Sequence, residues 1–174
     1  MSELHQAAER VAALLERTQT RIVFAESCTG GLVSATLTRV PGVSAWHCGS
    51  AVVYQSETKH RWLGISRDLL EGPGPVSPEV AGQMATRVLA DTPHADVAAA
   101  VTGHLGPNAP EGLDGLVYLA VAVRGEENAT IRRHVLDAPP ETDPIAVRLQ
   151  RQSAAAVLVF SAVEERLRGD AATE

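Results

Sequence analysis

Hydrophobic positions along the chain alternate between helix-like and strand-like spacing. Residues 4–15 carry apolar side chains at intervals of three and four, which predicts an amphipathic helix. Short runs rich in β-branched and other apolar residues follow, each bounded by glycine, proline or small polar residues. These runs predict five strands, at residues 21–26, 47–54, 96–101, 116–123 and 129–136.

Helical patterns separate these strands. Residues 32–40 predict a helix that ends at the following proline, and residues 56–64 predict a short helix or turn. Ser77 and Pro78 together are typical of a helix start, so we expect a helix that continues to about residue 89.

The end of the chain predicts a hairpin and a long helix. The turn at residues 125–128 is expected to join the last two strands, so at least one strand is antiparallel. A helix is expected from about residue 143 to 168. Its apolar stripe consists of Ile145, Leu149, Ala156, Phe160, Val163 and Leu167. The alternation of strands and helices favours a layered α/β domain with a largely parallel sheet, and no linker divides residues 1–174.

Composition narrows the class of protein. The 174 residues are 45% hydrophobic and 21% charged, which is typical of a folded globular domain. The net charge of −6 lacks the basic footprint of a nucleic-acid binder, so we expect no nucleic-acid partner. No apolar run reaches the ~18 residues of a membrane span, and the first helix lacks the features of a secretory signal. We therefore expect a cytoplasmic protein with no membrane partner.

The cationic residues are unevenly divided between arginine and lysine. Of the 15, 14 are arginine, and Lys59 is the only lysine. Chance explains this on composition alone. The alternative is that position 59 needs a side chain that can lose its proton, which arginine cannot do in a protein.

Polar segments follow three of the predicted strands, where ligands bind in open α/β sheets. The first segment places Ser27, Cys28 and Thr29 at a helix start, followed by Gly30 and Gly31. Its hydroxyls and thiol are candidate nucleophiles, and backbone N–H groups at a helix start favour an oxyanion or a phosphate. An ordinary helix cap in a tight turn accounts for the same residues.

The second and third segments add a candidate base and a glycine loop. Tyr54 and Lys59 follow the second strand; a neutral lysine can deprotonate a serine, and a tyrosine can assist it. A packed tyrosine and a solvated lysine are the alternative. Thr102, Gly103 and Gly106 follow the third strand and form either a loop that cradles a phosphate or ribose, or a simple turn.

Metal chemistry has no support in the spacing of candidate ligands. The six histidines show no HxH, HExxH or HxxxH pattern, and the two cysteines show no CxxC pattern. We expect no metal and no organic cofactor.

Taken together, the segments resemble a known family. In order along the chain, AESCTGGLVSATLTRVPGVS, GSAVVYQSETKHRWLGIS, GPVSPEVAGQMA, AVTGHLGP and GLVYLAV resemble the CinA C-terminal domain family, over about residues 22–123. The resemblance implies a three-layer α/β/α sandwich with a mixed, mostly parallel sheet of about five strands, as a stand-alone form. It also implies a nicotinamide-nucleotide amidohydrolase, which converts nicotinamide mononucleotide to nicotinate mononucleotide and ammonia. It implies no cofactor, a small nucleotide substrate and a homodimer.

The resemblance also implies roles for individual residues. Ser27 matches the family's nucleophile, Lys59 its base and Tyr54 its assisting tyrosine. Two further groups match the turn that supplies oxyanion donors and the loop that lines the nucleotide pocket: Thr29, Gly30 and Gly31 in the turn, and Thr102, Gly103 and Gly106 in the loop. The only lysine of the chain therefore falls at the position of the family's base. This favours a chemical reason for the single lysine over chance.

Two alternatives stay open. His104 and Leu105 stand where family members usually carry a hydrophobic and a small residue, which motivates a non-catalytic nucleotide-binding or competence/damage-related regulatory module. The other alternative makes Cys28 the nucleophile.

Overall fold

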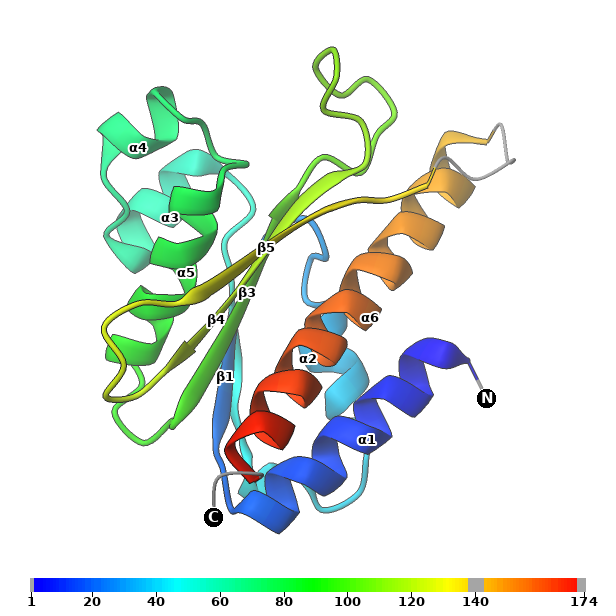
Figure 1. Cartoon of the computed structure of the whole chain (residues 1–174). Coiled ribbons are helices and arrows are strands. Elements are labelled where there is room, and N and C mark those ends of the chain that lie inside the picture. The colour runs from blue at the N-terminus through cyan, green and yellow to red at the C-terminus, as the bar shows by residue number, and fades with distance from the viewer. Residues whose placement is uncertain (1, 138–142, 172–174) are drawn as a thin grey trace.

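The computed structural model describes residues 2–137 and 143–171, which form a five-stranded sheet with helices on both faces (Figure 1). The strands are β1 (Ile22–Glu26), β2 (His47–Val52), β3 (Val97–Gly103), β4 (Leu116–Val123) and β5 (Thr130–Val135). The helices are α1 (Glu3–Thr18), α2 (Leu32–Leu37), the 3₁₀ helix η1 (Val43–Ala45), α3 (Ser56–Leu63), α4 (Arg67–Glu71), α5 (Pro78–Ala90) and α6 (Pro144–Ala171).

The sheet is mixed, with the strand order β2-β1-β3-β4-β5. The β1–β2 and β1–β3 pairs are parallel, and the β3–β4 and β4–β5 pairs are antiparallel. The expected hairpin of the last two strands is confirmed. The description as mostly parallel holds for strand direction, because only β4 runs against the other strands, but the pairings divide evenly.

Helices cover both faces, which confirms the three-layer α/β/α sandwich. Helices α1, α2 and α6 pack on one face against side chains such as Ile22 and Phe24 of β1. Helices α3, α4 and α5 pack on the other, where β3 and β4 present Ala98, Ala100, Ala120 and Ala122. Successive strand residues point to opposite faces, so the alternating pattern separates the two cores.

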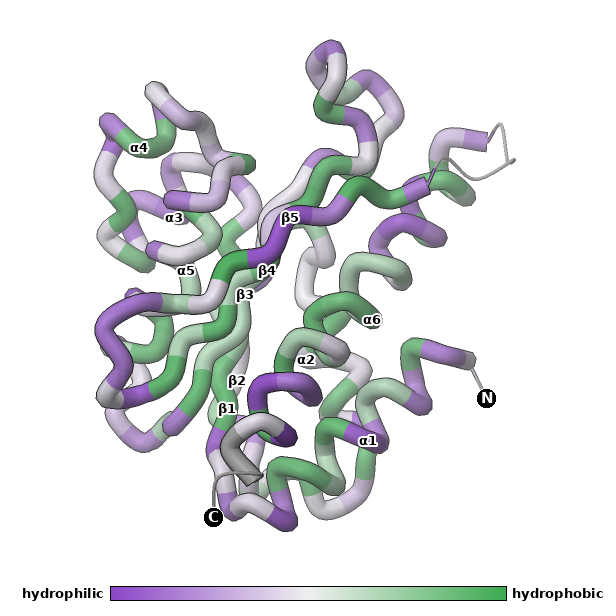
Figure 2. The backbone as a smooth tube through the Cα atoms, in the orientation of Figure 1, coloured by the Kyte–Doolittle hydropathy of each residue, from purple (hydrophilic) through white to green (hydrophobic). Residues whose placement is uncertain are grey.

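The central and edge strands differ in burial. Strands β3 and β4 are buried along most of their length and hydrophobic in Figure 2. Strand β5, at the sheet edge, is mostly exposed and carries hydrophilic residues at its centre. Among the described residues, no helix combines the length and the apolar character that crossing a membrane requires.

Helix boundaries agree with the capping signals and depart from the expectation in two places. The Ser77 hydroxyl accepts the Val80 N–H at the start of α5, as predicted. Helix α2 ends at Leu37 instead of residue 40. Helix α4 was not predicted; it is one short turn that begins with the capping side chain of Ser66.

The apolar stripe of α6 is only partly buried. Phe160, Val163 and Leu167 pack in the core with Ala156, as expected. Ile145 and Leu149 were placed on the same stripe but are exposed. In Figure 1 the first turns of α6 extend beyond α1, the helix that packs along it. The apolar stripe of α6 therefore continues past the end of the hydrophobic core.

Candidate active site

A cleft of about 400 Å³ opens where β1, β2 and β3 end. The three polar segments noted in the sequence meet there. The predicted site residues that line the cleft are Ser27, Tyr54, Lys59, Thr102, Gly103 and Gly106. The predicted oxyanion turn, Thr29 to Gly31, does not line it.

Backbone pairing beyond the strand ends sets the position of Ser27. The Ser27 N–H donates to the carbonyl oxygen of Val101 (3.0 Å), which extends the β1–β3 pairing by one residue. On the other side, the Val53 N–H donates to the Glu26 carbonyl (2.8 Å) and extends the β1–β2 pairing. Ser27 therefore leaves the sheet from a central strand with both neighbours fixed.

Ser27 and Lys59 are in direct contact. Lys59 lies in the first turn of α3, and its Nζ is 2.8 Å from the Ser27 Oγ. The same Nζ donates to the carbonyl oxygens of Val53 (2.8 Å) and Tyr54 (3.2 Å). Three oxygens from the ends of two adjacent strands thus hold one amine.

The environment of Lys59 favours its neutral form. Its side chain is only 1% exposed, and none of the ion pairs in the described part of the chain includes it. Burial disfavours a charged amine, and it lowers the pKa of Lys59 from 10.5 to about 8. A group with this pKa can act as a base near neutral pH.

The turn that follows Ser27 is organised by Glu26, a residue that the sequence analysis noted only as the end of a strand. Its carboxylate is 1% exposed. It accepts five hydrogen bonds, from the hydroxyls of Thr29 (2.8 Å) and Ser50 (3.1 Å) and the N–H groups of Gly31 (3.1 Å), Val33 (3.0 Å) and Ser34 (3.0 Å). Gly31 has φ of +99°, a conformation that glycine adopts readily. The side-chain carboxylate of Glu26 therefore caps the backbone N–H groups at the start of α2.

This cap uses donors that were expected to hold an oxyanion. The Gly31 N–H donates to Glu26, and the Gly30 N–H donates to the Ser27 carbonyl (3.1 Å). Among the hydrogen bonds of the described residues, none takes the N–H of Thr29, and the N–H of Cys28 contacts only its own thiol. Of the three predicted donors, the Thr29 N–H is thus left, and the Cys28 N–H, which was not predicted, lies next to it.

The Cys28 side chain is buried and packs in the hydrophobic core. It lies in the core under α1, α2 and α6. Burial raises the pKa of Cys28 to about 12, so the nucleophilic thiolate is disfavoured at neutral pH. The Cys28 carbonyl accepts a hydrogen bond from the Gln152 side chain of α6 (3.2 Å).

The hydroxyl of Tyr54 contacts Arg148 of α6. Tyr54 is 57% exposed, and its hydroxyl accepts a hydrogen bond from Nη2 of Arg148 (3.0 Å). Arg148 also donates from Nη1 to the Gly106 carbonyl (2.6 Å). Tyr54 therefore contacts Lys59 through its carbonyl and Arg148 through its hydroxyl.

Contacts with neighbouring segments fix the glycine loop that follows β3. The Thr102 hydroxyl donates to the Pro75 carbonyl (2.8 Å) and joins the loop to the start of α5. A Cβ at Gly103 would clash with Val117 Cγ1 and lie 2.8 Å from the Leu116 carbonyl oxygen, so the close approach of β4 requires glycine. Arg151 of α6 forms a bidentate ion pair with Asp114 (2.8 Å for both bonds) and anchors the far side of the loop.

The two residues that depart from the family pattern face different environments. His104 lines the cleft, and burial lowers its pKa, which keeps the imidazole neutral near pH 7. Leu105 is buried and packs in the core with α6 residues. Leu105 is also among the residues that line the cleft.

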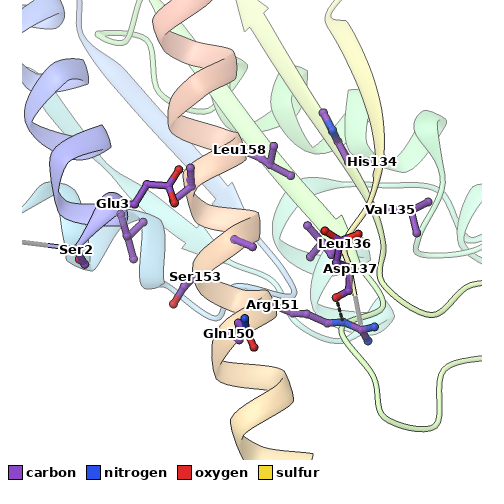
Figure 3. A pocket seen from close by; sticks show the side chains of 13 residues that line it. Ser2, Glu3, His134, Val135, Leu136, Asp137, Gln150, Arg151, Ser153 and Leu158 are labelled. Carbon is purple, nitrogen blue, oxygen red and sulfur yellow. Dashed lines mark hydrogen bonds between the residues drawn. The ribbon is translucent and has the colours of Figure 1, made fainter. Parts of the chain in front are cut away.

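A larger hollow lies elsewhere on the molecule. It measures about 600 Å³ and is formed by the start of α1, the end of β5 and α6, with Glu3, His134 and Arg151 among its lining residues (Figure 3). Arg151 is held there by the Asp137 carbonyl (3.3 Å) as well as by Asp114. No pair among its lining residues resembles Ser27 and Lys59. Within residues 2–137 and 143–171, no cluster of three histidine, cysteine or acidic residues could hold a metal.

Comparison with known proteins decides the family. The sequence model of the CinA C-terminal domain matches residues 4–160. The chain belongs to the CinA C-terminal domain family. The CinA-like protein of Dictyoglomus thermophilum is 44% identical over 120 residues, which is 68% of this chain and 29% of that protein. The CinA-like protein of Geobacter metallireducens is 44% identical over 116 residues, covering 64% of this chain and 27% of that protein.

Solved structures share the CinA-type fold. The crystal structure of competence damage-inducible protein A from Klebsiella pneumoniae has a TM-score of 0.85 at 27% identity, covering 96% of this chain and 98% of that one. The competence/damage inducible protein CihA from Agrobacterium tumefaciens has a TM-score of 0.79 at 29% identity, covering 92% and 96%. This chain thus spans less than a third of the curated relatives named above but nearly all of these solved chains.

Two residues of this CinA-family site escaped the sequence analysis. Glu26 had a local signal, since an acid just before a Thr-Gly-Gly turn can accept the N–H groups of the next helix. Arg148 had none, because it reaches Tyr54 from a helix 94 residues later in the chain.

Proposed function

We propose that this protein is a nicotinamide-nucleotide amidohydrolase, which hydrolyses nicotinamide mononucleotide to nicotinate mononucleotide and ammonia. The contact that carries the proposal is the 2.8 Å approach of the buried Lys59 Nζ to the Ser27 Oγ. A serine is a weak nucleophile until a nearby base takes its proton. A lysine with its pKa lowered to about 8 is such a base.

The hydrogen bonds of Lys59 orient its lone pair. A neutral amine has two N–H groups, and the Val53 and Tyr54 carbonyls accept both. The lone pair then faces the Ser27 hydroxyl. As the Ser27 Oγ attacks the carboxamide carbon, its proton passes to Nζ.

The remaining steps return the site to its starting state. The N–H of Thr29, which donates to no acceptor in the described residues, and the N–H of Cys28, which contacts only its own thiol, are the candidates for holding the oxyanion. Ammonia leaves with the proton held by Lys59, and an ester to Ser27 is left. Water then gives a proton to Lys59 and attacks the ester, and the proton returns to Ser27 as the acid is released.

The choice of substrate rests on the cleft and on the family. A volume of about 400 Å³ lies in the range of small-molecule sites, roughly 300–1,000 Å³. The choice of a nicotinamide nucleotide as the substrate comes from the resemblance of the sequence motifs to those of the family. A homodimer, a single domain over residues 1–174 and a cytoplasmic location stay predictions.

Ser27→Ala tests the proposal. Ammonia release from nicotinamide mononucleotide is expected to fall by about 10³-fold or more, because the attacking oxygen is gone. Ser153→Ala, on α6 and outside the cleft, is the matched control and should match the wild type. Retained turnover in Ser27→Ala would rule out the serine mechanism. Nucleotide binding in calorimetry without ammonia from any carboxamide would favour the non-catalytic module instead.

A further inference from the structure

The cleft has an unusual charge balance for this protein. The chain carries a net charge of −6, yet no aspartate or glutamate lines the cleft. Lys59 tends towards neutrality there, and arginine keeps its proton in proteins. Arg148 is therefore the permanent charge of the cleft.

No carboxylate within the described residues compensates that charge. Arg148 takes part in none of the ion pairs of residues 2–137 and 143–171. Arg151, one helical turn later, is neutralised by Asp114. The two arginines of α6 thus differ: Arg151 anchors a loop, and Arg148 presents an uncompensated charge to the cleft.

The contacts of Arg148 hold it but leave donors available. Nη1 donates to the Gly106 carbonyl and Nη2 to the Tyr54 hydroxyl. A guanidinium has five N–H groups, and these two contacts use two of them. Both acceptor oxygens are uncharged. They hold the guanidinium from two segments that line the cleft, and they leave its positive charge without a counter-charge. An anion with several oxygens, such as a phosphate monoester, matches its geometry and its charge.

We propose that Arg148 binds the phosphate group of the ligand of the Ser27–Lys59 site, and that Tyr54 is a positioning residue that holds Arg148. The identity of the ligand as a carboxamide rests on the proposed function; the phosphate site does not. Tyr54 contacts Lys59 only through its backbone carbonyl, which a side-chain substitution retains. Its hydroxyl thus acts on the anion and takes no part in the proton transfer at Ser27.

Arg148→Gln tests the anion contact, with Arg133→Gln as the matched control. Arg133 is exposed on β5, outside the cleft, and its replacement changes the net charge equally. The preference for nicotinamide mononucleotide over its dephosphorylated nucleoside should fall by about 10- to 100-fold in Arg148→Gln, through KM. It should not change in Arg133→Gln. An equal preference in wild type and Arg148→Gln would overturn the proposal.

Tyr54→Phe tests the positioning role, with Tyr118→Phe on β4 as the control. We expect a higher KM for the phosphorylated substrate, an unchanged pH profile, and no further loss when Tyr54→Phe is combined with Arg148→Gln. A lower kcat at constant KM, or a shifted pH profile, would show that the hydroxyl acts in proton transfer and would overturn this part.

Binding of inorganic phosphate separates this inference from the proposed function. Calorimetry at fixed ionic strength should show phosphate binding to the wild type and to Arg133→Gln, and at least tenfold weaker binding to Arg148→Gln. Such binding without ammonia release from any carboxamide would sink the amidohydrolase and leave the phosphate site. Equal phosphate binding by Arg148→Gln and wild type would sink the phosphate site, whatever the enzyme hydrolyses.

Discussion

Two buried ionisable residues neighbour Ser27, Glu26 in the sequence and Lys59 through a 2.8 Å contact, and their surroundings are opposite in kind. Glu26 accepts five hydrogen bonds from the turn, from α2 and from β2. Lys59 has two carbonyls and the Ser27 hydroxyl, with no opposite charge in any ion pair of the described residues. Both are 1% exposed, so burial alone does not distinguish them.

This difference indicates a structural role for Glu26 and a role in the reaction for Lys59. A buried carboxylate with both oxygens hydrogen-bonded holds its donors in place. A buried amine without a counter-charge gains from losing its proton, which makes it a base. Replacing Glu26 should therefore act on stability, and replacing Lys59 should act on turnover.

Lys59→Arg is expected to have the largest effect on turnover. Arginine keeps the charge but cannot accept the Ser27 proton, so ammonia release should fall by about 10³-fold or more. An ammonia assay measures the loss, and circular dichroism checks that the variant is folded. Arg61→Lys, an exposed exchange of the same two residue types on α3, is the control. Near-normal turnover of Lys59→Arg would remove lysine as the base.

Glu26→Ala should have the largest effect on stability. It leaves buried donors of the turn and of α2 without an acceptor, which should lower the free energy of unfolding by about 3–5 kcal/mol. Urea denaturation measures the change. The exposed Glu57→Ala, which breaks only surface ion pairs with Arg61 and Arg67, should have little effect. An equally small effect of Glu26→Ala would mean that the carboxylate does not hold the turn.

The pH dependence of turnover should report Lys59. Its pKa is lowered to about 8, and the neutral form is the base. Below this value the neutral fraction rises with pH, so kcat/KM should rise about tenfold per pH unit and level off above about pH 8. Initial rates from pH 5.5 to 9.5, with the stability of the protein checked at each end, measure it. A profile that is flat below pH 8 would contradict a lysine base.

Cys28→Ala should have the smallest effect. The buried thiol has its pKa raised to about 12, so it supplies no nucleophile at neutral pH, and most of the activity should remain. Removing a buried sulfur should lower the free energy of unfolding by about 1 kcal/mol. Paired ammonia and urea measurements on one preparation would show both. A loss of activity comparable to that of Ser27→Ala would restore Cys28 as a candidate nucleophile.

Much of the fold could be predicted from the sequence, because the signals are local. Strands such as β3 and β4 are continuous apolar runs, and the Ser77–Pro78 start of α5 is a capping pattern. The predictions were wrong where the local sequence pattern does not match the tertiary packing. Ile145 and Leu149 continue the apolar stripe of α6 but lie beyond the core, and α4 is too short to leave a periodic signal.

For the candidate site, the sequence by itself determined which side chains are available: a serine in a small-residue turn, and one lysine among arginines. Only the tertiary structure decided their geometry. Ser27 and Lys59 are 32 residues apart, and they meet because parallel pairing brings the ends of β1 and β2 to one edge of the sheet. The packing of α6 likewise brings Arg148 to Tyr54. Desolvation is a property of the folded surroundings, so the lowered pKa of Lys59 could not be predicted from its neighbours in the chain.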